Sequence, residues 1–184
     1  EAKKKNIDFK LIIGAAASKV MEKIALKKFK TDKIDFTKFK YSHNKISITK
    51  DFISIFKIKK IINRIKPSIV HTASPKANLY GIILSKFFRK IKFVISFSGL
   101  GYIFINNRGS IILSLKKFIY ISVLKIFLKE SKNVHLIMQN NDDLSLFKKI
   151  LNLNKSNIHL ILGGSGVDFN KFNPKVIVVE YLDL

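Results

Sequence analysis

The sequence predicts an α/β fold, a Rossmann-like parallel sheet with helices on both faces, and three observations support this prediction. Short apolar segments alternate along the chain with longer segments that have helical periodicity. The short segments contain few polar residues, as do strands that are buried on both faces of a parallel sheet. Apolar residues make up 47% of the 184 residues, which is enough to build a packed core.

The first third of the chain contains two expected strands and one expected helix. The apolar segment 9–13 reads as a short buried strand, and residues 34–41 alternate weakly, as in an edge strand. Residues 48–65 have the apolar stripe and basic face of an amphipathic helix. Asp51 near the start of this helix complements the helix dipole, and Pro67 prevents the helix from continuing.

The rest of the chain shows the clearest alternation. Strands are expected over residues 68–72, 92–97, 134–138 and 158–162. Helices are expected over residues 78–90, 110–129 and 141–151. A cluster of polar residues or glycines follows each of these strands. Because ligands of parallel sheets bind outside the carboxyl ends of the strands, the clusters indicate a binding site along one edge of the sheet.

The net charge of +23 favours an anionic partner, such as nucleic acid, acidic lipid or a phosphorylated substrate. The basic residues are 32 lysines and only 3 arginines, a bias that is also typical of an AT-rich genome. Proteins that read nucleic acid rely on arginine, whose planar fork grips phosphates and guanine edges. We therefore expect no nucleic-acid binding, whereas an anionic membrane surface fits scattered lysines better.

Several classes of site and location are excluded or disfavoured by composition. The absence of cysteine excludes disulfides, thiolate catalysis and cysteine zinc sites, and the four histidines lie too far apart to suggest a metal site. The longest uncharged run, residues 93–107, falls short of the roughly 18 apolar residues that span a bilayer. No secretory signal stands at the start. The expected location is the cytoplasm, either free or peripheral on the inner membrane face.

The individual motifs leave functional and structural interpretations open. His71 and Lys76 follow a strand, so they either face a ligand crevice or end the strand and lie in solvent. The glycines at 98–101 and 163–166 either let a backbone approach a ligand closely or form ordinary loops. Neither segment is a GxGxxG or Walker A motif, which disfavours a dehydrogenase or another nucleotide-using α/β enzyme.

Four motifs, taken together in their order along the chain, are more specific than any one of them alone. They are KPSIVHTASPKANLYG from Lys66, SGLGYIF from Ser98, MQNNDDLSLF from Met138 and GGSGVDFNKFNP from Gly163. This order resembles family 4 glycosyltransferases of the GT-B fold, in particular bacterial enzymes that build capsule, O-antigen or other surface polysaccharides. The resemblance runs from about residue 1 to residue 174. The opening residues resemble the end of the family's first helix and its second strand.

The resemblance implies a retaining transfer without bound metal or other cofactor, in a cleft between an acceptor-side N-terminal domain and a donor-side C-terminal domain. It implies that His71 lines the cleft near the transferred sugar, as the catalytic residue. The residues that it assigns to substrate binding are Thr72, Ser74, Lys76, Ser98, Gly99, Gly101, Tyr102, Asn140, Asp143, Ser165, Gly166 and Asp168.

The resemblance also sets the expected domains and partners. Residues 1–174 are expected to form the N-terminal domain without its first strand, and residues 175–184 a tail or the start of an absent donor domain. The polypeptide alone is therefore expected to be inactive. Its expected partners are a nucleotide sugar, a lipid-linked or saccharide acceptor and an anionic membrane, with helix 110–129 as the candidate membrane element or a core helix. The alternative is a non-enzymatic basic protein that binds membranes or polyanions by charge alone.

Overall fold

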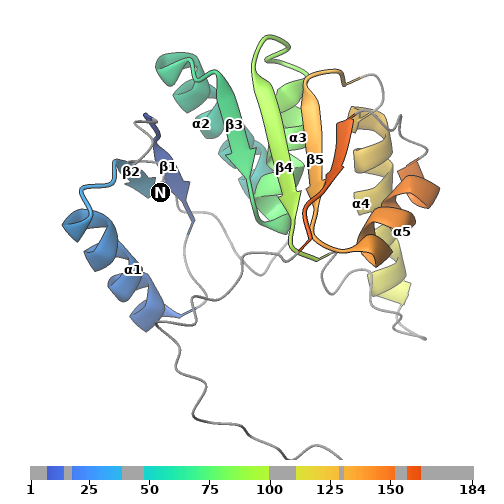
Figure 1. Ribbon diagram of the computed structural model, residues 1–184, viewed down its shortest axis with the longest axis horizontal. Helices are drawn as coiled ribbons and strands as arrows, with labels where there is room; N and C mark the ends of the chain where they lie inside the picture. The colour runs from blue at the N-terminus through green and yellow to red at the C-terminus, as the bar shows by residue number, and fades with distance from the viewer. Residues whose placement is uncertain are drawn as a thin grey trace, which may run out of the picture. The chain divides into compact units, whose positions relative to one another are not determined.

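The computed structural model describes residues 8–14, 18–38, 48–99, 111–128, 131–151 and 157–162. The chain divides into two compact units, residues 1–66 and residues 67–184, and each is considered by itself. Figure 1 shows the order of the elements along the chain. Parallel strands alternate with helices in both units, so the predicted α/β class is confirmed.

The first unit contains two parallel strands. β1 (Leu11–Ile13) pairs with β2 (Phe36–Lys38), and both strands are shorter than expected. Between them in the sequence lies α1 (Lys19–Thr31). Phe29 of α1 packs against Phe36 of β2, and the centroids of the two rings are 5.8 Å apart. We did not expect α1 from the sequence. It buries no residue completely, because lysines interrupt its apolar positions.

The same unit contains α2 (Ile48–Ile65), whose predicted bounds are confirmed. Ile62 is buried, whereas the Phe52 and Phe56 rings, also on the predicted apolar stripe, are about half exposed and lie 4.8 Å apart. Ser54 is buried as well, and its hydroxyl donates to the Lys50 carbonyl one turn earlier. The helix therefore satisfies its buried hydroxyl within its own backbone.

The second unit is built on a four-stranded parallel sheet in the order β3-β4-β5-β6. The strands are β3 (Ile69–Thr72), β4 (Lys92–Phe97), β5 (Val134–Met138) and β6 (Ile158–Leu160). The predicted bounds of β4 and β5 are confirmed, and β3 and β6 are slightly shorter than expected. Each strand pairs with the next strand in the sequence, so the sheet grows in one direction.

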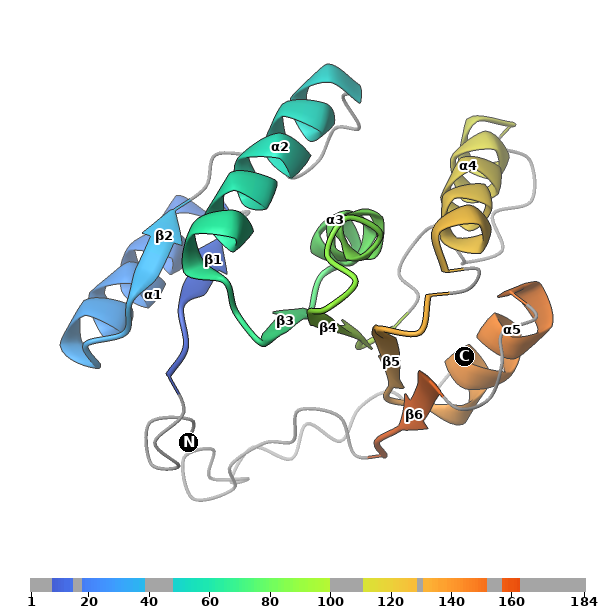
Figure 2. The ribbon, with the colours of Figure 1, turned by 90° about the horizontal axis from the view of Figure 1, so that it is seen from above.

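Three helices connect these strands: α3 (Pro75–Ser85), α4 (Ile111–Leu128) and α5 (Asn141–Leu151). All three lie on the same face of the sheet (Figure 2). Crossovers of the usual right hand place helices on one face when a sheet grows in one direction. None of the described helices has the length and apolarity needed to cross a bilayer.

The core of this unit lies between the sheet and its helices. Phe93, Ile95 and Phe97 alternate along β4 and are buried, and the Phe97 ring lies 4.8 Å from the ring of Phe147 on α5. Intervening strand residues point to the other face, because successive side chains of a strand alternate. His71 and the polar residues that share its face therefore lie opposite the helices.

Candidate functional site

The carboxyl ends of β3 and β4 bring together a histidine and a serine. The Nε2 atom of His71 and the Oγ atom of Ser96 lie 2.7 Å apart, at hydrogen-bond distance. His71 stands opposite Val94 in the strand register, so Ser96 is the next residue of β4 on the same face. The His71 side chain is exposed, and because this pair alternates with the buried residues of β4, it lies on the face away from the helices.

The pair offers a ligand both a hydrogen-bond donor and an acceptor. A neutral imidazole donates from one ring nitrogen and accepts at the other, and a hydroxyl can do either. Because Ser96 occupies Nε2, the tautomer of His71 decides whether Nδ1 donates or accepts. Saccharide hydroxyl groups are suitable partners for such a pair. Sequence reasoning missed Ser96, although it is a lone hydroxyl near the end of an apolar strand.

Thr72 has a different role in the structure from its neighbour His71. Its hydroxyl donates a 2.7 Å hydrogen bond to Asn78 Oδ1, and Asn78 Nδ2 donates to the Ser96 carbonyl at 2.9 Å. Asn78 is only 1% exposed, so its amide joins the ends of β3 and β4 to α3 inside the core. Sequence analysis placed Asn78 only at a helix start and missed this link, while the substrate-binding role of Thr72 stays a prediction.

Ser74 and Lys76 lie at the start of α3. Ser74 has the extended conformation that a residue before proline prefers, with φ −139° and ψ 152°. Its carbonyl accepts a hydrogen bond from the Asn78 backbone N–H, but its hydroxyl makes no capping hydrogen bond to the helix. Lys76 follows in the first turn and is half-buried. Helix α3 begins earlier than the predicted 78–90 because Pro75 suits the first helical position, and it ends at Ser85.

Ser98 and Gly99 directly follow β4. Ser98 is exposed, and no described heavy atom lies within 4 Å of the position that a Cβ on Gly99 would take. Gly101 and Tyr102, which the sequence also assigned to this loop, lie outside the described residues.

Asn140 and Asp143 form the N-terminal cap of α5. Asn140 Oδ1 accepts a 2.7 Å hydrogen bond from the Asp143 backbone N–H, and Asn140 Nδ2 donates to Asp143 Oδ2 at 2.8 Å. These two hydrogen bonds fix the positions of both side chains at the carboxyl edge of the sheet, next to the end of β5. Their substrate contacts stay a prediction. Ser165, Gly166 and Asp168 lie outside the described residues.

Comparison with known proteins identifies the family. Among curated proteins, none matches the sequence significantly. The sequence model described as glycosyl transferase 4-like matches residues 3–141, a range that includes His71 and Ser96 and ends before the GGSGVDFNKFNP segment. Within the described part of the chain, no group of three or more histidine, aspartate or glutamate side chains could hold a metal ion. Because the match covers most of the chain, this protein belongs to the glycosyl transferase 4-like family.

Proposed function

We propose that this chain is the acceptor-side domain of a retaining GT-B glycosyltransferase. The enzyme transfers a sugar from a nucleotide-sugar donor to a saccharide or lipid-linked acceptor during assembly of a surface polysaccharide. The observation that carries the proposal is the pairing of His71 with Ser96 at the carboxyl edge, inside the segment that matches the family. A binding protein that acts by charge alone would need no such pair.

The chemistry of the transfer fits this pair. A retaining transfer develops positive charge on the sugar and negative charge on the departing phosphate, and pre-positioned hydrogen bonds stabilise this separation. In our proposal His71 lies beside the transferred sugar and contacts the acceptor hydroxyl that receives it, and Ser96 fixes the orientation of its ring. In the proposal the acceptor approaches the same edge at Gly99, where no described side chain crowds the backbone. We assign no catalytic base, and no metal or other cofactor takes part.

The reaction needs a second, donor-binding domain in this proposal. Residues 1–174 supply the acceptor side, and residues 175–184 lead toward the donor side. In this division the acceptor side binds acceptor, and transfer requires the donor-binding domain as well. We place the enzyme at the cytoplasmic face of the membrane, where the positive charge of the chain attracts phosphorylated acceptors.

Acceptor binding provides the first test. The His71 ring resonances of the purified chain are followed by NMR while saccharide and lipid-linked acceptors are added. We expect them to shift with a matching acceptor, and the His71→Ala variant to lose that binding. If no surface-polysaccharide acceptor binds, or if binding does not depend on His71, the proposed site is wrong.

Transfer provides the second test. A panel of radiolabelled nucleotide sugars is offered to the chain with and without a donor-binding domain supplied in trans. We expect transfer only with the added domain. Transfer by residues 1–184 alone would contradict the proposed division between the two domains.

A further inference from the structure

A basic hollow lies at the amino edge of the sheet, opposite the candidate site. It has a volume of about 770 Å³ and lies where β4 and β5 begin. Its lining residues are Ser85, Lys86, Arg89, Lys90, Lys92, Ser131, Lys132, Asn133 and His135. We call this surface the amino-edge basic surface. Sequence analysis did not single it out, because its residues come from the separate connections before β4 and before β5.

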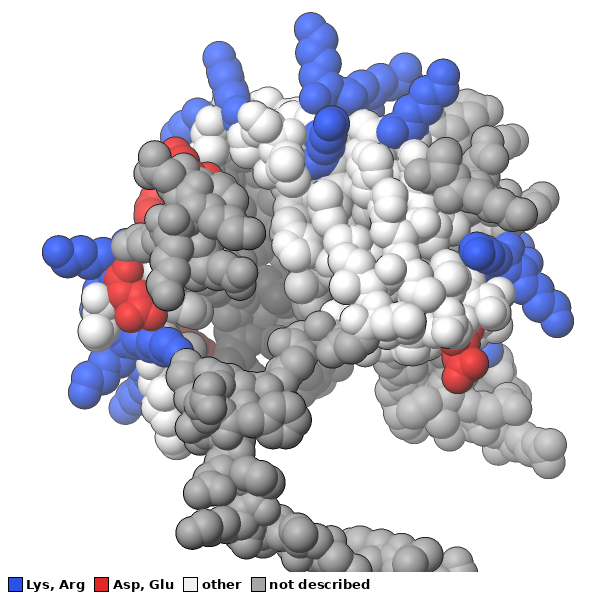
Figure 3. Space-filling view, viewed as in Figure 1, with Lys and Arg blue, Asp and Glu red and all other residues white. Residues whose placement is uncertain are grey.

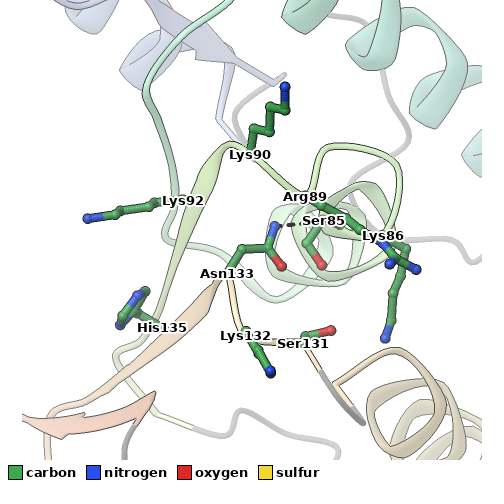
Figure 4. A pocket seen from close by; sticks show the side chains of 9 residues that line it. All are labelled: Ser85, Lys86, Arg89, Lys90, Lys92, Ser131, Lys132, Asn133 and His135. Carbon is green, nitrogen blue, oxygen red and sulfur yellow. Dashed lines mark hydrogen bonds between the residues drawn. The ribbon is translucent and has the colours of Figure 1, made fainter.

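The side chain of Asn133 links the two connections that form the hollow. Asn133 Nδ2 lies within hydrogen-bond distance of three carbonyl oxygens, those of Ser85 at 3.2 Å, Phe88 at 3.1 Å and Ile91 at 3.0 Å. These contacts fix the 85–91 connection against the start of β5. Figure 4 shows Asn133 at the centre of the lining residues. The basic side chains therefore extend from a defined backbone.

The charge of this surface is one-sided. Among the described residues that line the hollow, none is acidic and five are cationic, namely Lys86, Arg89, Lys90, Lys92 and Lys132. Figure 3 shows lysine and arginine side chains gathered along the upper edge of the molecule, where β4 and β5 begin. In Figure 4 they spread outward around Asn133 instead of converging on one point. This arrangement suits several separate anionic groups on a surface better than a single small anion.

An exposed aromatic ring belongs to the same 85–91 connection that contributes three of the cationic residues. Phe87 lies between Lys86 and Arg89 in the 85–91 connection and is 58% exposed. Aromatic rings insert at the boundary between lipid headgroups and acyl chains, and neighbouring lysines attract anionic headgroups. We propose that the amino-edge basic surface, together with Phe87, docks on a membrane that contains anionic phospholipids.

Docking at this edge has a consequence that rests on the proposed function. Strand β4 spans six residues, and at about 3.3 Å per residue it separates the two edges of the sheet by roughly 20 Å. A membrane at the amino edge would hold the carboxyl edge, with His71, at about that height above the headgroups. The acceptor would then be an extended saccharide, not a sugar attached directly to the lipid.

The chain contains no tryptophan, so a single introduced indole reports docking directly. The Phe87→Trp variant is mixed with vesicles of phosphatidylcholine, with or without phosphatidylglycerol. We expect a blue shift of its fluorescence only with phosphatidylglycerol. The matched Phe118→Trp variant places the probe on α4, at a residue that is 69% exposed, and should not shift. A shift at position 118 and none at position 87 would overturn the proposal and favour α4.

Charge variants separate this surface from the diffuse charge of the chain. The Lys90→Gln/Lys92→Gln/Lys132→Gln triple variant should bind anionic vesicles on the order of 100-fold more weakly, since each lysine near a membrane contributes roughly fivefold. Its control is the triple variant Lys19→Gln/Lys23→Gln/Lys27→Gln. These three lysines of α1 are exposed, and their substitution removes the same amount of positive charge. Equal losses in both variants would overturn a defined docking surface.

Two further readouts keep the result interpretable. Circular dichroism melting verifies that each variant is folded. A single-stranded oligonucleotide replaces the vesicles in a second titration, and an equal blue shift there would overturn a lipid partner in favour of nucleic acid. Because the vesicles carry no saccharide, a failure of docking leaves the acceptor-binding test of the proposed function unaffected, and the reverse also holds.

Discussion

The Nε2 atom of His71 lies 2.7 Å from the Oγ atom of Ser96, which joins the carboxyl ends of two neighbouring parallel strands. The two residues are 25 positions apart in the sequence and meet only because β3 and β4 pair in register. His71 would touch the sugar, whereas Ser96 would act through the orientation of the His71 ring. The two substitutions should therefore differ in their effects.

The first prediction concerns this difference. In the two-domain transferase, His71→Ala should lower kcat roughly 100-fold, as the loss of one transition-state hydrogen bond does in other enzymes. Ser96→Ala should lower kcat by about tenfold with little change in KM, because the ring is still present but no longer fixed. Steady-state kinetics measures both effects, and ¹⁵N NMR reports the tautomer of His71.

The control for this prediction is Ser96→Thr, which retains the hydroxyl group and should restore most of the activity. A purely structural role for Ser96 would instead lower the melting temperature of Ser96→Ala without altering the His71 tautomer. Unchanged kinetics in His71→Ala would contradict its assignment as the catalytic residue.

The second prediction concerns the buried amide of Asn78. Asn78→Ala removes the acceptor of the Thr72 hydroxyl and the donor to the Ser96 carbonyl, and leaves both groups without a partner in the core. We expect a loss of about 2–3 kcal/mol in the free energy of unfolding, measured by urea denaturation. The nearby Ser74→Ala variant should lose little, because the Ser74 hydroxyl makes no capping bond. A similar loss in both variants would contradict a special role for Asn78.

The third prediction concerns the close approach of α3 to the sheet. A Cβ on Gly81 would stand 2.9 Å from Thr72 Cγ2 and 3.0 Å from Ile95 Cδ1, both inside normal contact distance. Alanine is favoured over glycine within a helix by about 1 kcal/mol. Overpacking of a core commonly costs about 1–3 kcal/mol, so we expect Gly81→Ala to destabilise the fold by about 1 kcal/mol net.

A double variant tests the cause of this loss. Thr72→Ser removes the Cγ2 methyl group and retains the hydroxyl that donates to Asn78. Chemical denaturation of the two single variants and of Gly81→Ala/Thr72→Ser forms a complete cycle. The methyl deletion should make Gly81→Ala less destabilising. Additive effects in the cycle would show that the clash with Thr72 is not the cause.

The bounds of helices and strands could be predicted from the sequence where burial of one face produces a regular pattern of apolar residues. The bounds of β4 and β5 were correct because apolar side chains at alternate positions fill one core. The bounds of α2 were also correct, since its amphipathic period is long and Pro67 follows its end. Helix α1 was missed because lysines occupy many of its positions and none of its residues is fully buried, so the segment reads as polar even though its apolar residues follow a helical period.

The candidate site was predicted less completely than the fold. His71 was chosen because a family motif surrounds it, and its role stays a prediction, whereas its partner Ser96 depends on strand register, which the sequence does not specify. Asn78 was missed because its contacts reach residues on two different strands. The spacing of Asn140 and Asp143 is also that of a helix cap, and the structure shows this cap.

The last prediction concerns the alkaline stability of the chain. Burial raises the pKa of the Tyr120 phenol on α4 from 10.0 to about 12, because the anion is poorly solvated there. The raised pKa means that stability is fully present below pH 10 and is lost as the pH rises toward 12, where the unfolded chain ionises first. This group should account for roughly 2–3 kcal/mol of the loss, measured by urea denaturation at several pH values. Absorbance near 295 nm should show a late phase of tyrosine ionisation to which Tyr120 contributes. Tyr120→Phe should remove both effects, and an unchanged late phase in this variant would assign the raised pKa to another tyrosine.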